Sequence, residues 1–277
     1  MLKKCIILLA MFCMMMSTAF AEVVDSDVNF DDNYITITEV GLPKKGDTQI
    51  GQKKVHARKA AILNGYVALL AEAKQIAIEA SQTNEDEGFA SSSAQSRLSG
   101  AVRGAKIIHE EWDPSEEIYT VTMRMPIYGA ANSVAAAVMP RQEKQSFQQS
   151  AAYARERSLA KEGDIDLATD GNYTGVVIDC RGLDIRRAMS PVIVDESNSP
   201  IYGYKNLDYD YVVAHGMVGY SHDIGSYSRA GSKPMFIKAV GVKGFSSPRI
   251  ANADAAKLLA ENERTHFLDD TRVVFVF

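Results

Sequence analysis

The sequence predicts an α+β fold with two small domains, each an antiparallel or mixed sheet packed against a helix. Three observations support this prediction. They are a helical apolar pattern over residues 53–80, strands of alternating polarity on both sides of it, and a second series of apolar strands after residue 171. Strands and helices in such segregated order are typical of α+β proteins. The 277 residues are enough for two cores of this kind.

Residues 1–21 have the pattern of a cleavable export signal. Lys3 and Lys4 precede the apolar run Cys5–Met16, and the small residues Ala19 and Ala21 precede the expected cleavage site before Glu22. The run is too short to cross a bilayer, so no transmembrane segment is expected after cleavage. Cys13 lacks the small preceding residue that lipidation needs, so the chain is not a clear lipoprotein. We therefore expect a periplasmic, extracellular or outer-membrane-associated protein.

Charge and cysteine content narrow the classes of partner. The net charge is −5, and cleavage would remove two lysines and make it −7. An acidic chain without a basic block argues against binding to nucleic acid or to an anionic membrane. Cleavage would leave Cys180 as the only cysteine, which excludes an intrachain disulfide. Cys180 ends the apolar strand Thr174–Cys180, where a buried, inert thiol is expected.

The first domain is predicted to span residues 22–140. Polar and apolar residues alternate over Tyr34–Leu42, which predicts a half-buried strand. A polar loop, Pro43–Gly51, leads to a long helix over Lys53–Ala80, where apolar residues keep helical spacing for about seven turns. The face expected to be buried carries Val55, Ile62, Leu63, Tyr66, Leu69, Leu70, Ala73, Ile76, Ala77 and Ala80. The face expected to meet solvent carries Asn64, Glu72, Gln75 and Glu79.

The start of this helix is basic. Lys53, Lys54, Arg58 and Lys59 lie in its first turns, whereas the helix macrodipole favours basic residues at the opposite end. Two interpretations remain open. Either the long side chains cover the edge of the sheet, or they form a patch that docks an acidic partner.

The rest of the first domain is predicted from turn and loop residues. Ser81–Ser93 is rich in Ser, Glu and Asp and predicts a mobile loop. Alternating runs on both sides of Asp113–Glu117 predict a hairpin. Ala130–Met139 predicts a short helix, and the polar residues 141–170 predict an inter-domain linker with some helix.

The second domain is predicted to span residues 171–277. It begins with the buried strand Thr174–Cys180 and continues with a hairpin that turns at Asp195–Ser199. A helix is expected across Asn252–Glu263, with Asn252 as its N-cap. The apolar run at 272–277 predicts a closing strand.

Several segments of the first domain resemble a known family. They are His56–Tyr66 in the long helix, Gly100–Lys106, and Met125–Gly129 at the end of a strand. Over Tyr34–Pro140 the chain resembles the LPP-twenty lipoprotein family and the N-terminal domain of flagellar assembly protein T. The second half resembles a companion domain seen with such domains in bacterial envelope proteins. The resemblance implies a non-enzymatic envelope protein, in some members tied to the outer parts of the flagellum.

The sequence contains the residue types that a thiol hydrolase uses, but not the sequence motifs that accompany them in such enzymes. Cys180 with His215 or His222 and a nearby aspartate would form a Cys-His-Asp site. No flanking signature accompanies them, and no Gly-x-Ser-x-Gly motif occurs. We therefore expect no enzymatic activity, with a hydrolase that uses Cys180 as the alternative.

A run of aspartates resembles a calcium-binding loop but does not have the ligand spacing of one. Asp164, Asp166 and Asp170 suggest an EF-hand loop, but its register would place Ala168 and Val177 at ligand positions. We expect no metal and no cofactor, and a looser calcium site stays a weaker option.

The segment Ile201–Tyr211 combines aromatic and acidic residues. Tyr202, Tyr204, Tyr209 and Tyr211 would form a sugar- or peptide-binding surface if they pointed outward, because tyrosine supplies contact area at low entropic cost. The alternative is a connecting loop whose tyrosines are half-buried at the sheet rim.

These observations favour an exported, non-enzymatic bacterial envelope protein with a binding or scaffold role, in which flagellar association follows only from the resemblance. Its partner surface would include Lys53, Lys54, Arg58 and the four tyrosines. The expected partners are envelope proteins of unknown identity or a second copy of the chain. A glycan- or calcium-binding module is a further alternative.

Overall fold

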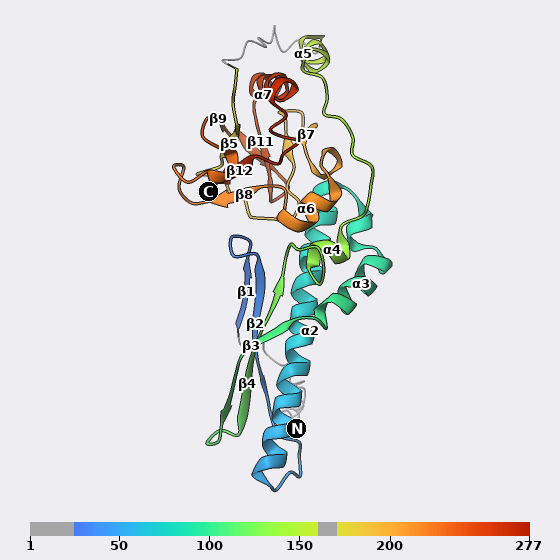
Figure 1. Cartoon of the computed structure of the whole chain (residues 1–277), viewed down its shortest axis with the longest axis vertical. Coiled ribbons are helices and arrows are strands. Elements are labelled where there is room, and N and C mark those ends of the chain that lie inside the picture. The colour runs from blue at the N-terminus through green and yellow to red at the C-terminus, as the bar shows by residue number, and fades with distance from the viewer. Residues whose placement is uncertain (1–24, 160–170) are drawn as a thin grey trace, which may run out of the picture.

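The computed structural model describes residues 25–159 and 171–277. The expected signal peptide and the end of the predicted linker lie outside the described residues. The fold is α+β, with helices and several small sheets. Figure 1 shows an elongated molecule in which a sheet and a long helix form one end and the remaining sheets form the other.

The first sheet is antiparallel and has the strand order β1-β2-β4-β3. Its strands are β1 (Asp25–Asn29), β2 (Tyr34–Gly41), β3 (Lys106–Asp113) and β4 (Ile118–Pro126). The predicted strand and hairpin are confirmed, whereas β1 was not predicted. In β2, Ile35 and Ile37 are buried on the face that the long helix covers.

The long helix α2 (Ile50–Asn84) extends beyond both predicted ends and packs on β2 and β4. Small residues form its contact with the sheet. A Cβ atom added at Gly41 of β2 would lie 2.1 Å from the carbonyl oxygen of Ala57 and 2.2 Å from the backbone nitrogen of Ala61. At Gly65, an added Cβ would lie 2.5 Å from the sulfur of Met123. Helix and strand backbones therefore touch directly.

This close contact rotates α2 away from the predicted orientation. Leu69 and Ile76 are buried as expected, but Leu63 is 64% exposed and Val55 is 50% exposed. Asn64, expected to face solvent, donates a hydrogen bond to the carbonyl oxygen of Val40 at 2.9 Å. The prediction was wrong here because it aimed the largest residues at the sheet, whereas the backbone contact admits only glycine and alanine.

Glu39 is a buried carboxylate between this sheet and α2. Its side chain lies on the same face of β2 as Ile35 and Ile37, it is 2% exposed, and Oε2 has no hydrogen-bond partner. Removal from water raises the pKa of Glu39, although the backbone N–H of Val40 opposes this shift.

We expect Glu39→Gln to stabilise the protein at pH 7. A raised pKa means that the folded state prefers the protonated acid, so its contribution to stability is present at low pH and is lost as pH rises through the folded-state pKa. The difference in unfolding free energy between variant and wild type, measured in urea, should therefore grow from pH 4 to pH 7. Glu111→Gln is the control, because it removes one negative charge from an exposed side chain. Equal stability of Glu39→Gln and wild type at both pH values would contradict the assignment.

The predicted mobile loop at 81–93 is instead largely helical. After α2, the chain forms η1 (Glu87–Ala90) and α3 (Ser92–Val102). Phe89 is fully buried, and the Asp86 side chain accepts a hydrogen bond from the backbone N–H of Gly88 at 2.8 Å. The polar residues that suggested a loop are thus helix caps. The short helix expected at 130–139 is α4 (Val134–Val138).

The second half contains two further sheets. One has the order β10-β11-β6-β7 and the other β8-β12-β5-β9. The first consists of β6 (Ile193–Val194), β7 (Pro200–Tyr202), β10 (Gly241–Lys243) and β11 (Ser247–Arg249). The second consists of β5 (Gly175–Asp179), β8 (Gly219–Ser221), β9 (Pro234–Lys238) and β12 (Val273–Val276). The remaining elements are η2 (Tyr204–Asn206), α6 (Tyr209–His215), η3 (Ser228–Ala230) and α7 (Asn252–Thr265).

The β8-β12-β5-β9 sheet is parallel throughout. This explains the unbroken apolar runs of β5 and β12, because strands of parallel sheets are covered on both faces. The β6–β7 hairpin and the closing strand are confirmed. The predicted N-cap is wrong by one residue: Ala251 occupies that position, and Asn252 is the first helical residue.

Residues 141–159 lie against the second half. Gln145 donates a backbone hydrogen bond to the carbonyl oxygen of Lys205 at 2.8 Å. Helix α5 (Ser150–Leu159) packs against α7. Arg157 of α5 reaches the β6–β7 turn and pairs with Asp195, which is fully buried. This stretch is therefore held in place over its described length.

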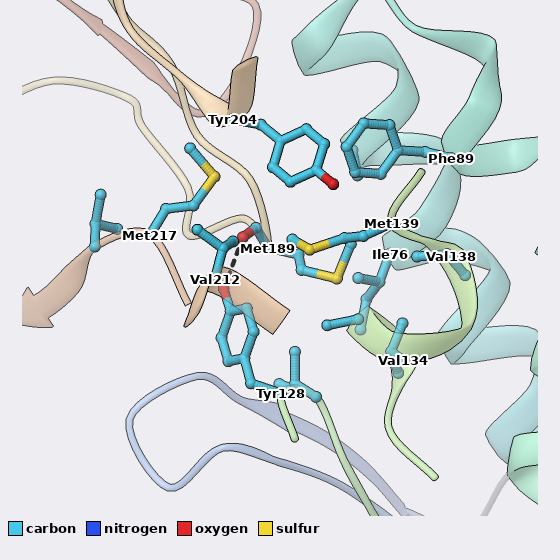
Figure 2. Packing of buried hydrophobic residues seen from close by; sticks show 14 of the residues in the cluster. Ile76, Phe89, Tyr128, Val134, Val138, Met139, Met189, Tyr204, Val212 and Met217 are labelled. Atoms are coloured by element: carbon cyan, nitrogen blue, oxygen red, sulfur yellow. Dashed lines mark hydrogen bonds between the residues drawn. The ribbon is translucent and has the colours of Figure 1, made fainter. Parts of the chain in front are cut away.

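The two ends of the molecule share one core. In Figure 2, Ile76 of α2, Phe89 of η1 and the α4 residues Val134 and Val138 meet apolar residues of the second half. The Tyr128 hydroxyl donates to the carbonyl oxygen of Met189 at 2.7 Å. Phe89 packs edge to face on Tyr204, with ring centroids 5.4 Å apart. Aromatic and methionine side chains thus fix the junction.

Candidate interaction surface

The side of α2 that faces away from the sheet is apolar and open to solvent. Leu63 and Val67 are 64% and 63% exposed, and Ile78 is 42% exposed. By length and composition α2 alone among the described helices could cross a membrane, yet only 39% of its most apolar 18-residue window is buried. The buried share is the face on the sheet. The remainder of the window is half-buried or exposed, and its exposed residues include Leu63, Val67 and Ile78.

We call the exposed apolar and basic side chains of residues 42–78 the α2 surface, leaving out Lys54, which lies on the opposite side of the helix from Leu63. Its apolar members are Leu42, Ile50, Val55, Leu63, Val67 and Ile78. Its charged members are Lys44, Lys45 and Lys59. All residues of this range are described, and none of those classed as exposed is acidic. The surface is therefore apolar and cationic, in a chain whose net charge is −5.

Helical spacing gathers part of this surface into a stripe. Lys59, Leu63 and Val67 follow one another at four residues, and Leu70 and Lys74 continue the same side of α2. Leu70 and Lys74 are half-buried. The apolar centre of the stripe thus has a lysine one turn before it and another one turn after it.

The one acidic residue of the loop before α2 is partly covered and paired. Asp47 accepts a hydrogen bond from Nδ1 of His56 at 2.7 Å and another from the backbone N–H of Lys44 at 2.9 Å. The hydrogen bond with His56 is the main cause that lowers the pKa of Asp47. Its charge is therefore partly neutralised within the chain.

The three basic residues expected to dock a partner separate into two groups. The Nζ of Lys53 lies 2.5 Å from Oε1 of Glu117, and Nε of Arg58 lies 2.7 Å from Oε2 of Glu110. The hydrogen bond from Arg58 lowers the pKa of Glu110. Lys53 and Arg58 thus bind the β3–β4 hairpin, in line with the sheet-edge interpretation. Lys54 is exposed, but at nine residues from Leu63 it lies on the opposite side of α2, and its charge contributes to the lowered pKa of Glu110.

Two of the four tyrosines are too deeply buried to form a binding surface. Tyr202 is 0% exposed and its hydroxyl donates to the carbonyl oxygen of Met217 at 2.6 Å. Tyr204 is 2% exposed and donates to the carbonyl oxygen of Pro140. Burial raises the pKa of both phenols. Residues 201–204 are all buried, so both tyrosines belong to the core at β7 and η2.

The other two tyrosines remain near solvent. The guanidinium of Arg141 lies over the ring of Tyr209 at 4.2 Å. Tyr211 is 44% exposed and stacks on His215, with ring centroids 4.5 Å apart. Both lie on α6, and together they offer a much smaller aromatic surface than the four predicted.

Cys180 lies in the core. It is 1% exposed, and its sulfur contacts the carbonyl oxygen of Ile178 at 3.7 Å. Burial, with a smaller contribution from the charge of Asp179, raises the pKa of the thiol to about 12. His222 hydrogen-bonds Arg187 at 2.9 Å, and His215 stacks on Tyr211. These contacts do not assemble a Cys-His pair.

We expect Cys180 to resist alkylation in the native protein, because a buried thiol of raised pKa supplies almost no thiolate at pH 7.5. Iodoacetamide should label it only after unfolding in urea, as followed by mass spectrometry. Labelling of the native protein as fast as that of the unfolded chain would restore the hydrolase alternative.

Metal ligands do not gather in the described part of the chain. No group of three or more His, Cys, Asp or Glu side chains able to hold a metal ion occurs within residues 25–159 and 171–277. Asp164, Asp166 and Asp170, the calcium-like run, lie outside these residues.

A polar hollow of about 510 Å³ lies between the end of α2 and the second half. Amide side chains such as Asn84 and Asn206 line it, together with Lys243. Lys243 is paired with Glu85 at 2.7 Å, and Asn84 donates to the carbonyl oxygen of Ser190 at 3.0 Å. These polar groups therefore already connect parts of the chain.

The comparisons with known proteins concern the second half. No curated protein matches the chain. The family match leaves out Tyr34–Pro140, so the resemblance of that part to the LPP-twenty family stays an expectation. Residues 175–277, which carry the parallel sheet, α6 and α7, match the bacterial domain described as the second domain of Treponema pallidum Tp0624.

Proposed function

We propose that this is an exported, non-enzymatic bacterial envelope protein that works by binding, with the α2 surface as its contact site. One observation carries the proposal: a long helix, rigidly seated on its own sheet, presents Leu63, Val67 and Ile78 to solvent. Contiguous exposed apolar side chains on a soluble domain are typical of interaction sites. A scaffold role at the periplasmic or outer-membrane face agrees with the expected export signal. Association with the flagellum is the finer form of the proposal and rests on the LPP-twenty resemblance.

Residue-specific photo-crosslinking in the living cell tests this function. A photoreactive residue at Val67 should form adducts with another macromolecule of the envelope, protein or lipid. The same residue at Val240, which is 55% exposed in the second half, is the matched control and should form few adducts. Absence of adducts from Val67, or equal yields from both positions, would overturn the proposal.

A further inference from the structure

We infer that the α2 surface binds an anionic phospholipid bilayer. This inference rests on the proposed function and names the partner of the same site. Three exposed lysines and six exposed apolar side chains form the surface, and no exposed acidic residue interrupts it. Helices that lie on membranes combine an apolar face with lysines beside it, which pair with anionic headgroups.

The stripe on α2 fits the depth profile of a bilayer surface. Leu63 and Val67 protrude at its centre, where they would enter the boundary between headgroups and acyl chains. Lys59 lies one turn before Leu63, and Lys74 lies two turns after Val67. Their flexible side chains can reach phosphate groups while their apolar stems stay with the acyl chains. Tyr66, half-buried beside them, is the kind of residue that favours the interface.

The surface continues beyond the helix. Leu42 and Ile50, at the two ends of the preceding loop, are 61% and 67% exposed. Lys44 and Lys45 lie between them and are exposed as well. The same pairing of apolar and cationic side chains thus recurs at the end of the molecule far from the second half (Figure 1).

Charge argues against a second copy of the chain as the occupant. Two α2 helices packed by their stripes in parallel would bring Lys74 against Lys74, and an antiparallel pair centred between Tyr66 and Val67 would bring Lys59 against Lys74. Like charges at such a seam are destabilising. Anionic phosphates instead neutralise every lysine of the surface without requiring a matching pattern of carboxylates.

The net charge of the whole chain conceals this local excess. Five acidic residues of the first half, at positions 110, 111, 113, 116 and 117, lie on the β3–β4 hairpin, where Glu110 and Glu117 bind Arg58 and Lys53. The expectation that an acidic chain avoids anionic membranes therefore does not extend to the α2 surface. Part of the negative charge of the first half lies on the hairpin, away from the exposed side of α2, so the net charge of the chain does not describe this surface.

Vesicle sedimentation with the exported protein tests the inference. Vesicles of phosphatidylglycerol and phosphatidylethanolamine should sediment the protein at low salt, and vesicles of phosphatidylcholine should not. Lys59→Glu should weaken binding roughly tenfold or more, because each lysine near an anionic surface contributes about 1 kcal/mol and reversal adds repulsion. Leu63→Ser with Val67→Ser should also weaken it, through the loss of apolar contact.

Two exposed positions outside the surface serve as matched controls. Lys205→Glu and Val240→Ser, both in the second half, should leave vesicle binding unchanged. Equal sedimentation by both lipid compositions, or equal losses from Lys59→Glu and Lys205→Glu, would overturn the inference. Absence of vesicle binding together with protein adducts or self-adducts from Val67 would replace the lipid with a protein partner and leave the proposed function intact. Absence of both would remove the proposed function as well.

Discussion

Replacing Gly41 by alanine is expected to lower the free energy of unfolding by about 3 kcal/mol, at the upper end of the usual cost of overpacking. The new methyl group would lie 2.1 Å from the carbonyl oxygen of Ala57 and 2.2 Å from the backbone nitrogen of Ala61. Both atoms belong to the backbone of α2, so relief requires the helix to move off the sheet. Urea unfolding followed by the fluorescence of Trp112, the only tryptophan, reports on this sheet directly.

Gly100→Ala is the matched control for this substitution. Gly100 lies within α3, and no atom lies within 4 Å of an added Cβ. Alanine is better than glycine inside a helix by up to about 1 kcal/mol, so this variant should be as stable as wild type or more stable. If Gly41→Ala were as stable as Gly100→Ala, direct contact between α2 and β2 would be disproved.

Arg157→Ala should lower the free energy of unfolding by about 3–5 kcal/mol, the usual cost of removing one partner of a buried ion pair. Asp195 is fully buried and would keep its charge without the guanidinium. Its remaining donors are the Tyr153 hydroxyl at 3.0 Å and the backbone N–H groups of Ser197 and Ser199, both at 2.9 Å. Because Arg157 attaches α5 to the β6–β7 turn, limited proteolysis should also cut the variant within 141–159.

Arg141→Ala tests whether burial of the ion pair is the cause of the loss in unfolding free energy expected for Arg157→Ala. Arg141 pairs with Asp210 at 2.8 Å, but both side chains are at least 70% exposed. Exposed pairs contribute about 0–1 kcal/mol, so urea unfolding should barely change. Equal losses from Arg157→Ala and Arg141→Ala would contradict the assignment of a buried ion pair.

The strands and the long helix could be predicted because their signals are local. Alternation in Tyr34–Gly41 and the apolar recurrence over 53–80 depend only on neighbouring residues. The face that α2 buries depends on tertiary contacts, of Gly41 in β2 with Ala57 and Ala61 and of Gly65 with Met123 in β4. About half of its circumference is apolar, so the sequence pattern alone could not decide which part faces the sheet.

The contrast between local signals and tertiary contacts also explains the other differences between the predicted and the observed structure. Ser91 suggested a loop, but its side chain accepts a hydrogen bond from the backbone N–H of Ala94 and caps α3. The parallel sheet had a usable signal, since β5 and β12 are apolar without alternation. The α2 surface had a partial signal in the basic start of the helix. Separating Lys53 and Arg58, which bind the hairpin, from exposed Lys59 required the folded structure.

Cysteine accessibility at two neighbouring positions tests the exposed side of α2 most directly. Val67 is 63% exposed and Ala68 is 6% exposed. With Cys180 buried as the common background, Val67→Cys should react rapidly with a maleimide in the native protein and become protected on phosphatidylglycerol vesicles. Ala68→Cys should react only after unfolding. Labelling of Ala68→Cys as fast as Val67→Cys, or protection of Val67→Cys in the isolated protein, would contradict the account.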